Sequence, residues 1–204
     1  MSAPLLALEG VSKVYRRGIV RRVTAFRLDV DLRFDGPAIV GVMGPNGAGK
    51  TTLFEMIAGS NVPSAGRVTV AGSDIQRVRY AERDRLAIHY HQSYQVRRFA
   101  RTWPSFMLER ASSSYPRVHL FDEPQFNTQD GYIGFMLDFF RHLRAEGRLV
   151  FICLHPTAVL HLELLNEVCE SFVFVSGGRA TRFSTFAEMA GQPDVRNYLG
   201  ALAP

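Results

Sequence analysis

The clearest alternation of apolar and polar positions in this chain lies between residues 26 and 34. Every second side chain of Phe26–Phe34 is Phe, Leu or Val, and the positions between them carry only Arg or Asp. A period of two predicts a β-strand with one buried face and one solvated face. Asp35-Gly36-Pro37 then signals a turn, and the chain enters the apolar run Ala38–Met43, which predicts a buried strand.

Further apolar runs alternate with stretches of helical character along the rest of the chain. Short strands are expected at Arg67–Val70, Val118–Phe121 and Leu149–Leu154. Helices are expected at about 52–58, 131–145 and 157–168, and a glycine pair at 177–178 separates the two strands of a hairpin, 172–176 and 179–183. Strands that alternate with helices favour an α/β fold, with helices flanking a mostly parallel central sheet.

Length and composition fit one domain over residues 1–204. Hydrophobic residues make up 47% of the chain, an ordinary share for a protein with a full core. No apolar run approaches the ~18 residues of a membrane-spanning helix, and the first ten residues lack the features of a secretory signal. Cys153, one of two cysteines, lies inside an apolar run, which favours a buried reduced thiol and a cytoplasmic location.

The net charge of +5 comes almost entirely from arginine. One cluster consists of Arg16, Arg17, Arg21 and Arg22, and a second is spread between residues 77 and 101. Nucleic acid or an acidic membrane face would attract such clusters, and a solvated surface accounts for them as well. Nucleic acid is the weaker interpretation, because no recognised binding module accompanies the charge.

The strongest chemical motif follows the strand at Ala38–Met43. Its sequence, Gly-Pro-Asn-Gly-Ala-Gly-Lys-Thr-Thr, fits G-x-x-x-x-G-K-[ST] and precedes an expected helix. In such a loop, backbone N–H groups and the helix N-terminus bind phosphate oxygens. Lys50 would bind the β- and γ-phosphates, and the Thr51 hydroxyl would bind Mg²⁺. The loop residues predicted to bind nucleotide are Gly44, Pro45, Asn46, Gly47, Ala48, Gly49, Lys50, Thr51 and Thr52.

A second motif places two carboxylates at the end of an apolar strand. Val118–Phe121 runs directly into Asp122 and Glu123. In phosphate-loop enzymes an acid at this place holds Mg²⁺ together with the loop hydroxyl, which makes Asp122 a candidate ligand for both nucleotide and metal. The next carboxylate can orient or deprotonate an attacking water, which makes Glu123 the candidate catalytic base.

Together these motifs resemble the ATP-binding cassette (ABC) ATPases, and the resemblance runs from about Leu5 to Phe183. It implies a phosphate-loop fold with an antiparallel β segment near the N-terminus, and ATP and Mg²⁺ as cofactors. Tyr15 takes the place of the aromatic residue that stacks on adenine, with a plain surface aromatic as the alternative. Gln92 takes the place of the glutamine that contacts Mg²⁺ and the attacking water, with a loop glutamine of no role as the alternative.

His155 follows the strand at Leu149–Leu154 and resembles the family's switch histidine, which contacts the γ-phosphate. An imidazole can donate a hydrogen bond to an anionic oxygen at neutral pH, and a histidine that caps a strand end would look the same. The tail, residues 192–204, has apolar residues at helical spacing and is interpreted as a short packing helix without chemistry. The remaining histidines fit no role and are interpreted as structural or surface residues: His89, His91, His119, His142 and His161.

The sequence departs from the family where a helical subdomain normally carries the signature Leu-Ser-Gly-Gly-Gln. Only 29 residues separate Gln92 from Asp122, and this signature occurs nowhere in the chain. A reduced helical subdomain is expected at about 93–116, and the signature position falls near Arg98–Thr102, which lacks paired glycines. Aromatic residues within Tyr94–Pro104 either bind membrane subunits or cover core that the missing helices leave bare.

The resemblance implies an ATP-binding subunit of an ABC transporter-like complex, which hydrolyses Mg-ATP and drives conformational change in transmembrane permease subunits. It would work as a dimer, either with itself or, as the missing signature favours, with a second subunit that carries the signature. The implied location is cytoplasmic, peripheral to the inner face of the cell membrane. The alternatives are a regulatory or scaffold subunit with little hydrolysis, and a soluble ABC ATPase outside transport.

Overall fold

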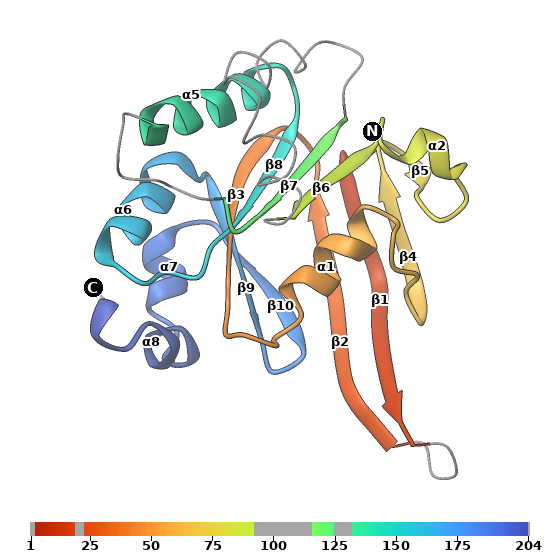
Figure 1. Ribbon diagram of the computed structural model, residues 1–204, viewed down its shortest axis with the longest axis horizontal. Helices are drawn as coiled ribbons and strands as arrows, with labels where there is room; N and C mark the ends of the chain where they lie inside the picture. The colour runs from red at the N-terminus through yellow and green to blue at the C-terminus, as the bar shows by residue number, and fades with distance from the viewer. Residues whose placement is uncertain (1–2, 19–22, 92–115, 125–131, 204) are drawn as a thin grey trace.

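The computed structural model describes residues 3–18, 23–91, 116–124 and 132–203. Its strands form one sheet in the order β5-β4-β1-β2-β10-β9-β3-β8-β7-β6 (Figure 1). The strands are β1 (Leu6–Arg17), β2 (Val23–Phe34), β3 (Ala38–Met43), β4 (Ala65–Val70), β5 (Ser73–Asp74), β6 (Ala87–His91), β7 (Val118–Asp122), β8 (Leu149–Cys153), β9 (Ser171–Ser176) and β10 (Arg179–Phe183). The helices are α1 (Lys50–Ile57), α2 (Tyr80–Arg83), α5 (Tyr132–Ala145), α6 (Val159–Val168), α7 (Phe186–Ala190) and α8 (Pro193–Leu199), and a 3₁₀ turn covers Gly200–Leu202.

The half of the sheet that ends in the two motifs is parallel. Strands β9, β3, β8, β7 and β6 run side by side in one direction, as the alternation of strands and helices predicts. Val42 of β3 lies opposite Cys153 of β8, and Cys153 lies opposite Asp122 of β7. This register brings the loop after β3 and the carboxylates after β7 to the same edge of the sheet.

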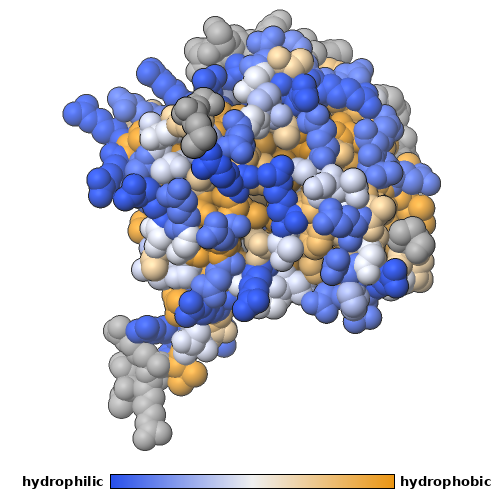
Figure 2. Space-filling view, turned by 180° about the vertical axis from the view of Figure 1, so that it is seen from behind, coloured by the Kyte–Doolittle hydropathy of each residue, from blue (hydrophilic) through white to orange (hydrophobic). Residues whose placement is uncertain are grey.

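The other half of the sheet is antiparallel. It consists of β5, β4, β1 and β2, which confirms the antiparallel segment expected near the N-terminus. The two halves are continuous, because β10 pairs in parallel with β2 at Arg179↔Asp29 and Ala180↔Val30. The hairpin of β1 and β2 extends well beyond the rest of the molecule, as both views show (Figures 1 and 2).

Two apolar clusters, one on each face of the sheet, hold the layers together. On one face α1 packs against the strands, with the ring of Phe54 6.0 Å from that of Phe151. On the other face α5, α6, α7 and α8 cover the sheet, with Phe140 of α5 4.9 Å from Phe121 (Figure 1). Strands β3 and β8 send alternate side chains into both clusters, which explains why their sequences are continuous apolar runs.

Two helices begin at a different residue from the one that the sequence predicts. Helix α1 begins at Lys50 rather than near residue 52, because Gly49 has a φ of 105° and turns the loop directly into the helix. Helix α6 begins at Val159 rather than near residue 157, because Ala158 still has an extended backbone. In both cases the backbone of one residue just before the helix decides the boundary.

Helix α7 has a start signal that apolar periodicity does not detect. Thr185 Oγ1 accepts a hydrogen bond from the backbone N–H of Glu188 at 3.1 Å, and the Glu188 carboxylate accepts one from the N–H of Ser184 at 2.9 Å. The first bond is the N-cap half of a capping box, which a Thr followed three residues later by a Glu predicts, and the second satisfies the N–H of the residue before the N-cap. The sequence signal for this helix is therefore present in its first turn.

Several features expected from the sequence lie outside the described residues. They are Gln92, the signature position, the aromatic segment Tyr94–Pro104, and all of the reduced helical subdomain except Pro116. Among the helices that the structure describes, none combines the length and the apolar character that crossing a membrane would take.

Candidate nucleotide-binding site

The loop between β3 and α1 has a backbone that only glycine adopts without strain. Gly44, Gly47 and Gly49 have φ angles of 150°, 76° and 105°. At Gly44 an added Cβ atom would lie 2.0 Å from the carbonyl oxygen of Val175 in β9. The loop therefore passes close to the neighbouring strand, and its curvature depends on these glycines.

Lys50 is held across this loop by the loop's own backbone. Its Nζ donates hydrogen bonds to the carbonyl oxygens of Gly44 at 2.6 Å and Pro45 at 2.9 Å, and the residue is 8% exposed. Lys50 is also the first residue of α1, where backbone N–H groups carry the positive end of the helix dipole. An anionic group at this place would meet an ammonium and a helix N-terminus together.

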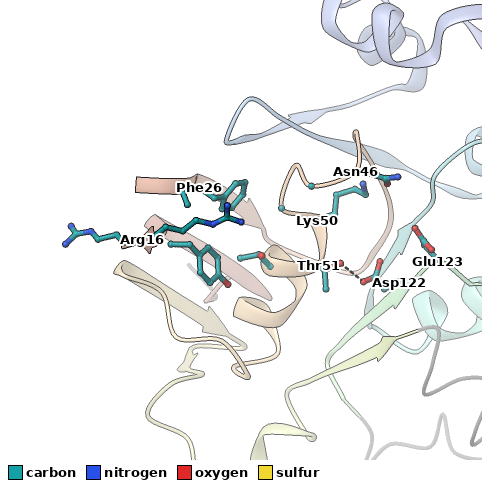
Figure 3. A pocket seen from close by; sticks show the side chains of 13 residues that line it. Arg16, Phe26, Asn46, Lys50, Thr51, Asp122 and Glu123 are labelled. Atoms are coloured by element: carbon teal, nitrogen blue, oxygen red, sulfur yellow. Dashed lines mark hydrogen bonds between the residues drawn. The ribbon is translucent and has the colours of Figure 1, made fainter. Parts of the chain in front are cut away.

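The hydroxyl of Thr51 contacts the first carboxylate after β7. Thr51 Oγ1 donates to Asp122 Oδ2 at 3.0 Å, although 71 residues separate the two in sequence (Figure 3). A hydroxyl and a carboxylate are oxygen ligands of the kind that Mg²⁺ binds. Two of the three side chains that the sequence predicts at the magnesium ion are thus neighbours, and their chemistry fits that ion; the third, Gln92, lies outside the described residues.

Asp122 is buried, with 6% of the residue exposed, yet it is held in its charged form. Burial raises the pKa of its carboxyl, but hydrogen bonds with His89, Thr51 and Cys153 and the charge of His89 outweigh burial and leave the pKa below its ordinary value. His89 Nε2 lies 3.3 Å from Asp122 Oδ2. His89, interpreted from the sequence as a structural or surface residue, thus contacts the same carboxylate oxygen as Thr51.

Glu123 has a backbone conformation that is unusual for a residue with a side chain. Its φ angle is 52°, and its N–H donates to the carbonyl oxygen of Cys153 at 2.9 Å. A left-handed backbone outside glycine costs on the order of 1 kcal/mol and is frequent at functional sites. The side chain is exposed and lines the same cavity as Asp122 (Figure 3).

A cavity of about 650 Å³ connects these groups to the β1–β2 hairpin. Three elements form its walls, as Figure 3 shows: the hairpin, the loop with the start of α1, and the end of β7. Its lining residues are Tyr15, Arg16, Arg17, Ala25, Phe26, Asn46, Gly47, Gly49, Lys50, Thr51, Thr52, Asp122 and Glu123. Gly44, Pro45 and Ala48 shape the loop without lining the cavity.

The hairpin wall is aromatic and basic. Tyr15 is 40% exposed, its ring lies 6.1 Å from that of Phe26, and its hydroxyl accepts a hydrogen bond from Asn61 Nδ2 at 2.8 Å. The structure thus places Tyr15 in the cavity as the sequence predicts, and adds Phe26, Arg16 and Arg17. Phe26 is missed by sequence reasoning because it continues the apolar phase of β2, which indicates core packing.

His155 follows β8 and pairs with a residue of the last helix. Its Nδ1 lies 3.0 Å from the hydroxyl of Tyr198 in α8. The pKa of Tyr198 is raised to about 12, chiefly by burial. The tail, interpreted from the sequence as a short packing helix, also contacts the predicted switch histidine through Tyr198. His155 itself does not line the cavity.

Comparison with known protein families agrees with this geometry. Residues 28–105 match the family model described as ABC transporter. The chain is 36% identical over 93 residues to the ribose import ATP-binding protein of Cereibacter sphaeroides, 41% over 87 residues to the methionine import ATP-binding protein of Nocardia farcinica, and 41% over 75 residues to the lipoprotein-releasing system ATP-binding protein of Ruegeria pomeroyi. These alignments cover 45%, 40% and 37% of this chain, and 17%, 25% and 32% of the respective relatives, so the chain spans less than a third of each relative's length.

Solved structures extend the likeness of fold to nearly the whole chain. A nucleotide-free ATP-binding cassette from an ABC transporter superposes with a TM-score of 0.67 at 18% identity, over 96% of this chain and 98% of that one. A dimeric ATP-binding cassette bound to ADP and Pi superposes with a TM-score of 0.66 at 16% identity, over 88% and 98% of the two chains. At these identities the likeness concerns the fold.

Proposed function

We propose that this chain, which belongs to the ATP-binding cassette family, is the ATP-binding subunit of a membrane transporter complex and hydrolyses Mg-ATP there. The observation that carries the proposal is the contact of Thr51 with Asp122 beside the Lys50 ammonium. It joins two distant motifs into one site with the charges that a magnesium triphosphate requires.

The cavity accommodates a nucleotide along its length. Lys50 and the N-terminus of α1 would bind the β- and γ-phosphates. The aromatic rings of Tyr15 and Phe26, at the far end of the cavity, would pack against the adenine, and Arg16 lies on the same wall. Mg²⁺ on Thr51 and Asp122 would neutralise phosphate charge when bound.

The hydrolytic step would use groups at the edge where β7 and β8 end. Glu123, exposed to the cavity, would accept a hydrogen bond from the attacking water and orient it toward the γ-phosphate. His155 would donate a hydrogen bond to a γ-phosphate oxygen. Gln92, which is adjacent to the end of β6 in sequence, would contact the metal and the same water as its position in the motif predicts.

The partners follow from what the chain lacks. Its sequence contains no Leu-Ser-Gly-Gly-Gln, so a second subunit with that signature would complete the site. Loss of a single donor to a developing anion commonly lowers a rate by ~10²–10³-fold, so hydrolysis would be slow without that subunit. The complex would dock on permease subunits at the inner face of the membrane.

The missing signature also favours a second candidate function. A regulatory subunit would bind ATP and dimerise without appreciable turnover, and the same cavity would serve it. A role on nucleic acid has less support, because Arg16 and Arg17 line the nucleotide cavity and Arg83 donates to backbone carbonyls such as that of Val78.

The test compares ATP binding and Mg²⁺-dependent hydrolysis by the purified chain with those of Glu123→Gln. We expect both proteins to bind ATP, and the substitution to lower hydrolysis by at least ~10²-fold, because an amide cannot accept the water's proton. Binding with equal, negligible turnover in both proteins would support the regulatory subunit. Absence of ATP binding by the unsubstituted chain would overturn both functions.

A further inference from the structure

A single hydroxyl links two parts of the molecule that are distant in sequence. The Tyr198 hydroxyl in α8 lies 3.0 Å from Nδ1 of His155, which follows β8. Tyr198 itself does not line the cavity, so it would act on a ligand there only through His155.

Tyr198 is held rigidly enough to direct its partner. On the same helix Val195 is fully buried and Leu199 is 4% exposed, so α8 is anchored in the apolar cluster. The ring of Tyr198 packs 5.6 Å from that of Phe174 in β9. A side chain fixed by its helix and by a neighbouring ring can orient the imidazole that it touches.

The hydrogen bond determines which nitrogen of His155 carries the proton. A phenol O–H is a stronger donor than an imidazole N–H, and an imidazole nitrogen is a stronger acceptor than a phenol oxygen. The Tyr198 O–H therefore donates, and Nδ1 of His155 accepts it. A neutral imidazole that accepts at Nδ1 carries its proton on Nε2.

We infer that Tyr198 is a positioning residue that keeps His155 in the Nε2–H tautomer and turns this N–H toward the γ-phosphate. The inference rests on the proposed function for its ligand and on the described contacts for its geometry. It assigns the last helix a share in distinguishing ATP from ADP, because only ATP carries the phosphate that His155 would contact.

The test uses Tyr198→Phe, which keeps the ring and removes the hydroxyl, and Tyr90→Phe as a matched control. The Tyr90 hydroxyl also contacts a histidine Nδ1, that of His119 at 3.2 Å, away from the cavity. Imidazole ¹⁵N spectra recorded near pH 8, with His155 assigned through His155→Gln, report the tautomer without any nucleotide. Dissociation constants for ADP and for a non-hydrolysable ATP analogue report the contact with the γ-phosphate.

We expect His155 to show the Nε2–H tautomer with a hydrogen-bonded Nδ1, and Tyr198→Phe to abolish that hydrogen-bonded signal. The substitution should weaken binding of the ATP analogue by about two- to tenfold and leave ADP binding unchanged, the size expected for one lost hydrogen bond. Tyr90→Phe should change neither constant.

Three results would overturn the inference: a proton on Nδ1 of His155, an equal loss of ATP and ADP affinity in Tyr198→Phe, or the same loss in Tyr90→Phe. If the chain binds no nucleotide, the proposed function fails, and the tautomer in the nucleotide-free spectrum still decides the role of Tyr198.

Discussion

Two tyrosine–histidine pairs make nearly the same contact in two different regions of the molecule. Tyr198 meets Nδ1 of His155 at 3.0 Å, and Tyr90 meets Nδ1 of His119 at 3.2 Å. His155 is half-buried beside the phosphate-binding loop, whereas His119 is 2% exposed and its ring stacks with that of Tyr90 at 5.9 Å.

The burial of the second nitrogen separates the two pairs. His119 Nε2 has no hydrogen-bond partner among the described residues, and burial, together with the charge of Arg148, lowers the pKa of His119 to about 3. Such a histidine stays neutral and acts as a flat core side chain. The same pair of residues thus fills a core in one place and, in the proposed function, positions a ligand-binding group in the other.

The largest effect is expected for a substitution that removes the histidine of the Tyr198–His155 pair. Replacement of His155 by Ala should lower ATP turnover by ~10²-fold or more, because the transition state loses a donor to the γ-phosphate. The free energy of unfolding should fall by only about 0.5–1.5 kcal/mol, since His155 is half-buried and loses one hydrogen bond, that with Tyr198. Steady-state hydrolysis, in the presence of a signature-bearing partner if the chain alone is slow, measures the effect. Unchanged turnover would remove His155 from the mechanism.

The next prediction, with an intermediate expected effect, concerns the pH dependence of stability that His119 contributes. Unfolded His119 titrates near its ordinary pKa of 6.5 and folded His119 near 3, so the unfolded state binds more protons between these values. The free energy of unfolding therefore falls as the pH is lowered through this window, by at most about 1.4 kcal/mol per pH unit from this group. Replacement of His119 by Leu should remove this part of the slope.

Urea unfolding of both proteins at several pH values between neutrality and pH 4 measures that difference. Near neutral pH the two stabilities should lie within about 1.5 kcal/mol of each other, because removal of an unpartnered nitrogen offsets part of the loss of the hydrogen bond with Tyr90. Parallel pH profiles would show that His119 is protonated to the same extent in both states, and the contrast between the pairs would fail.

The smallest effect is expected for a substitution that removes only the hydroxyl of the Tyr90–His119 pair. Tyr90→Phe should lower the free energy of unfolding by about 0.5–1.5 kcal/mol, the usual net value of one hydrogen bond. ATP turnover should stay at the level of the unsubstituted protein. Urea unfolding and hydrolysis assays on the same preparation measure both, and a loss of turnover would show that the two pairs are coupled.

Much of the site could be predicted because short motifs of adjacent residues carry its chemistry. The alternation in Phe26–Phe34 predicts β2, and the glycine-lysine motif predicts a loop whose positive φ angles the structure confirms. Asp122 is predicted beside Thr51 because motifs at the ends of parallel strands meet at one edge of a sheet.

The residues that sequence reasoning missed are those whose role depends on tertiary contacts. His89 looks like any residue of a short strand, and only the pairing of β6 with β7 brings it to Asp122. Tyr198 shares its helical spacing with Val195 and Leu199, which indicates packing alone. The return of the tail to the end of β8 turns one of these three into a partner of His155.

The seam between β2 and β10 has a consequence for how the two halves of the sheet move. It consists of two register pairs, a hydrogen bond from Asp29 N–H to the Gly178 carbonyl at 2.8 Å, and one from Arg182 Nη1 of β10 to the Arg33 carbonyl of β2 at 2.6 Å. The hairpin wall lies on one side of this seam and the phosphate-binding loop on the other. A nucleotide bound as proposed would contact both sides of this seam and so oppose its local opening. Amide hydrogens along the seam should therefore exchange with solvent more slowly once the cavity is filled.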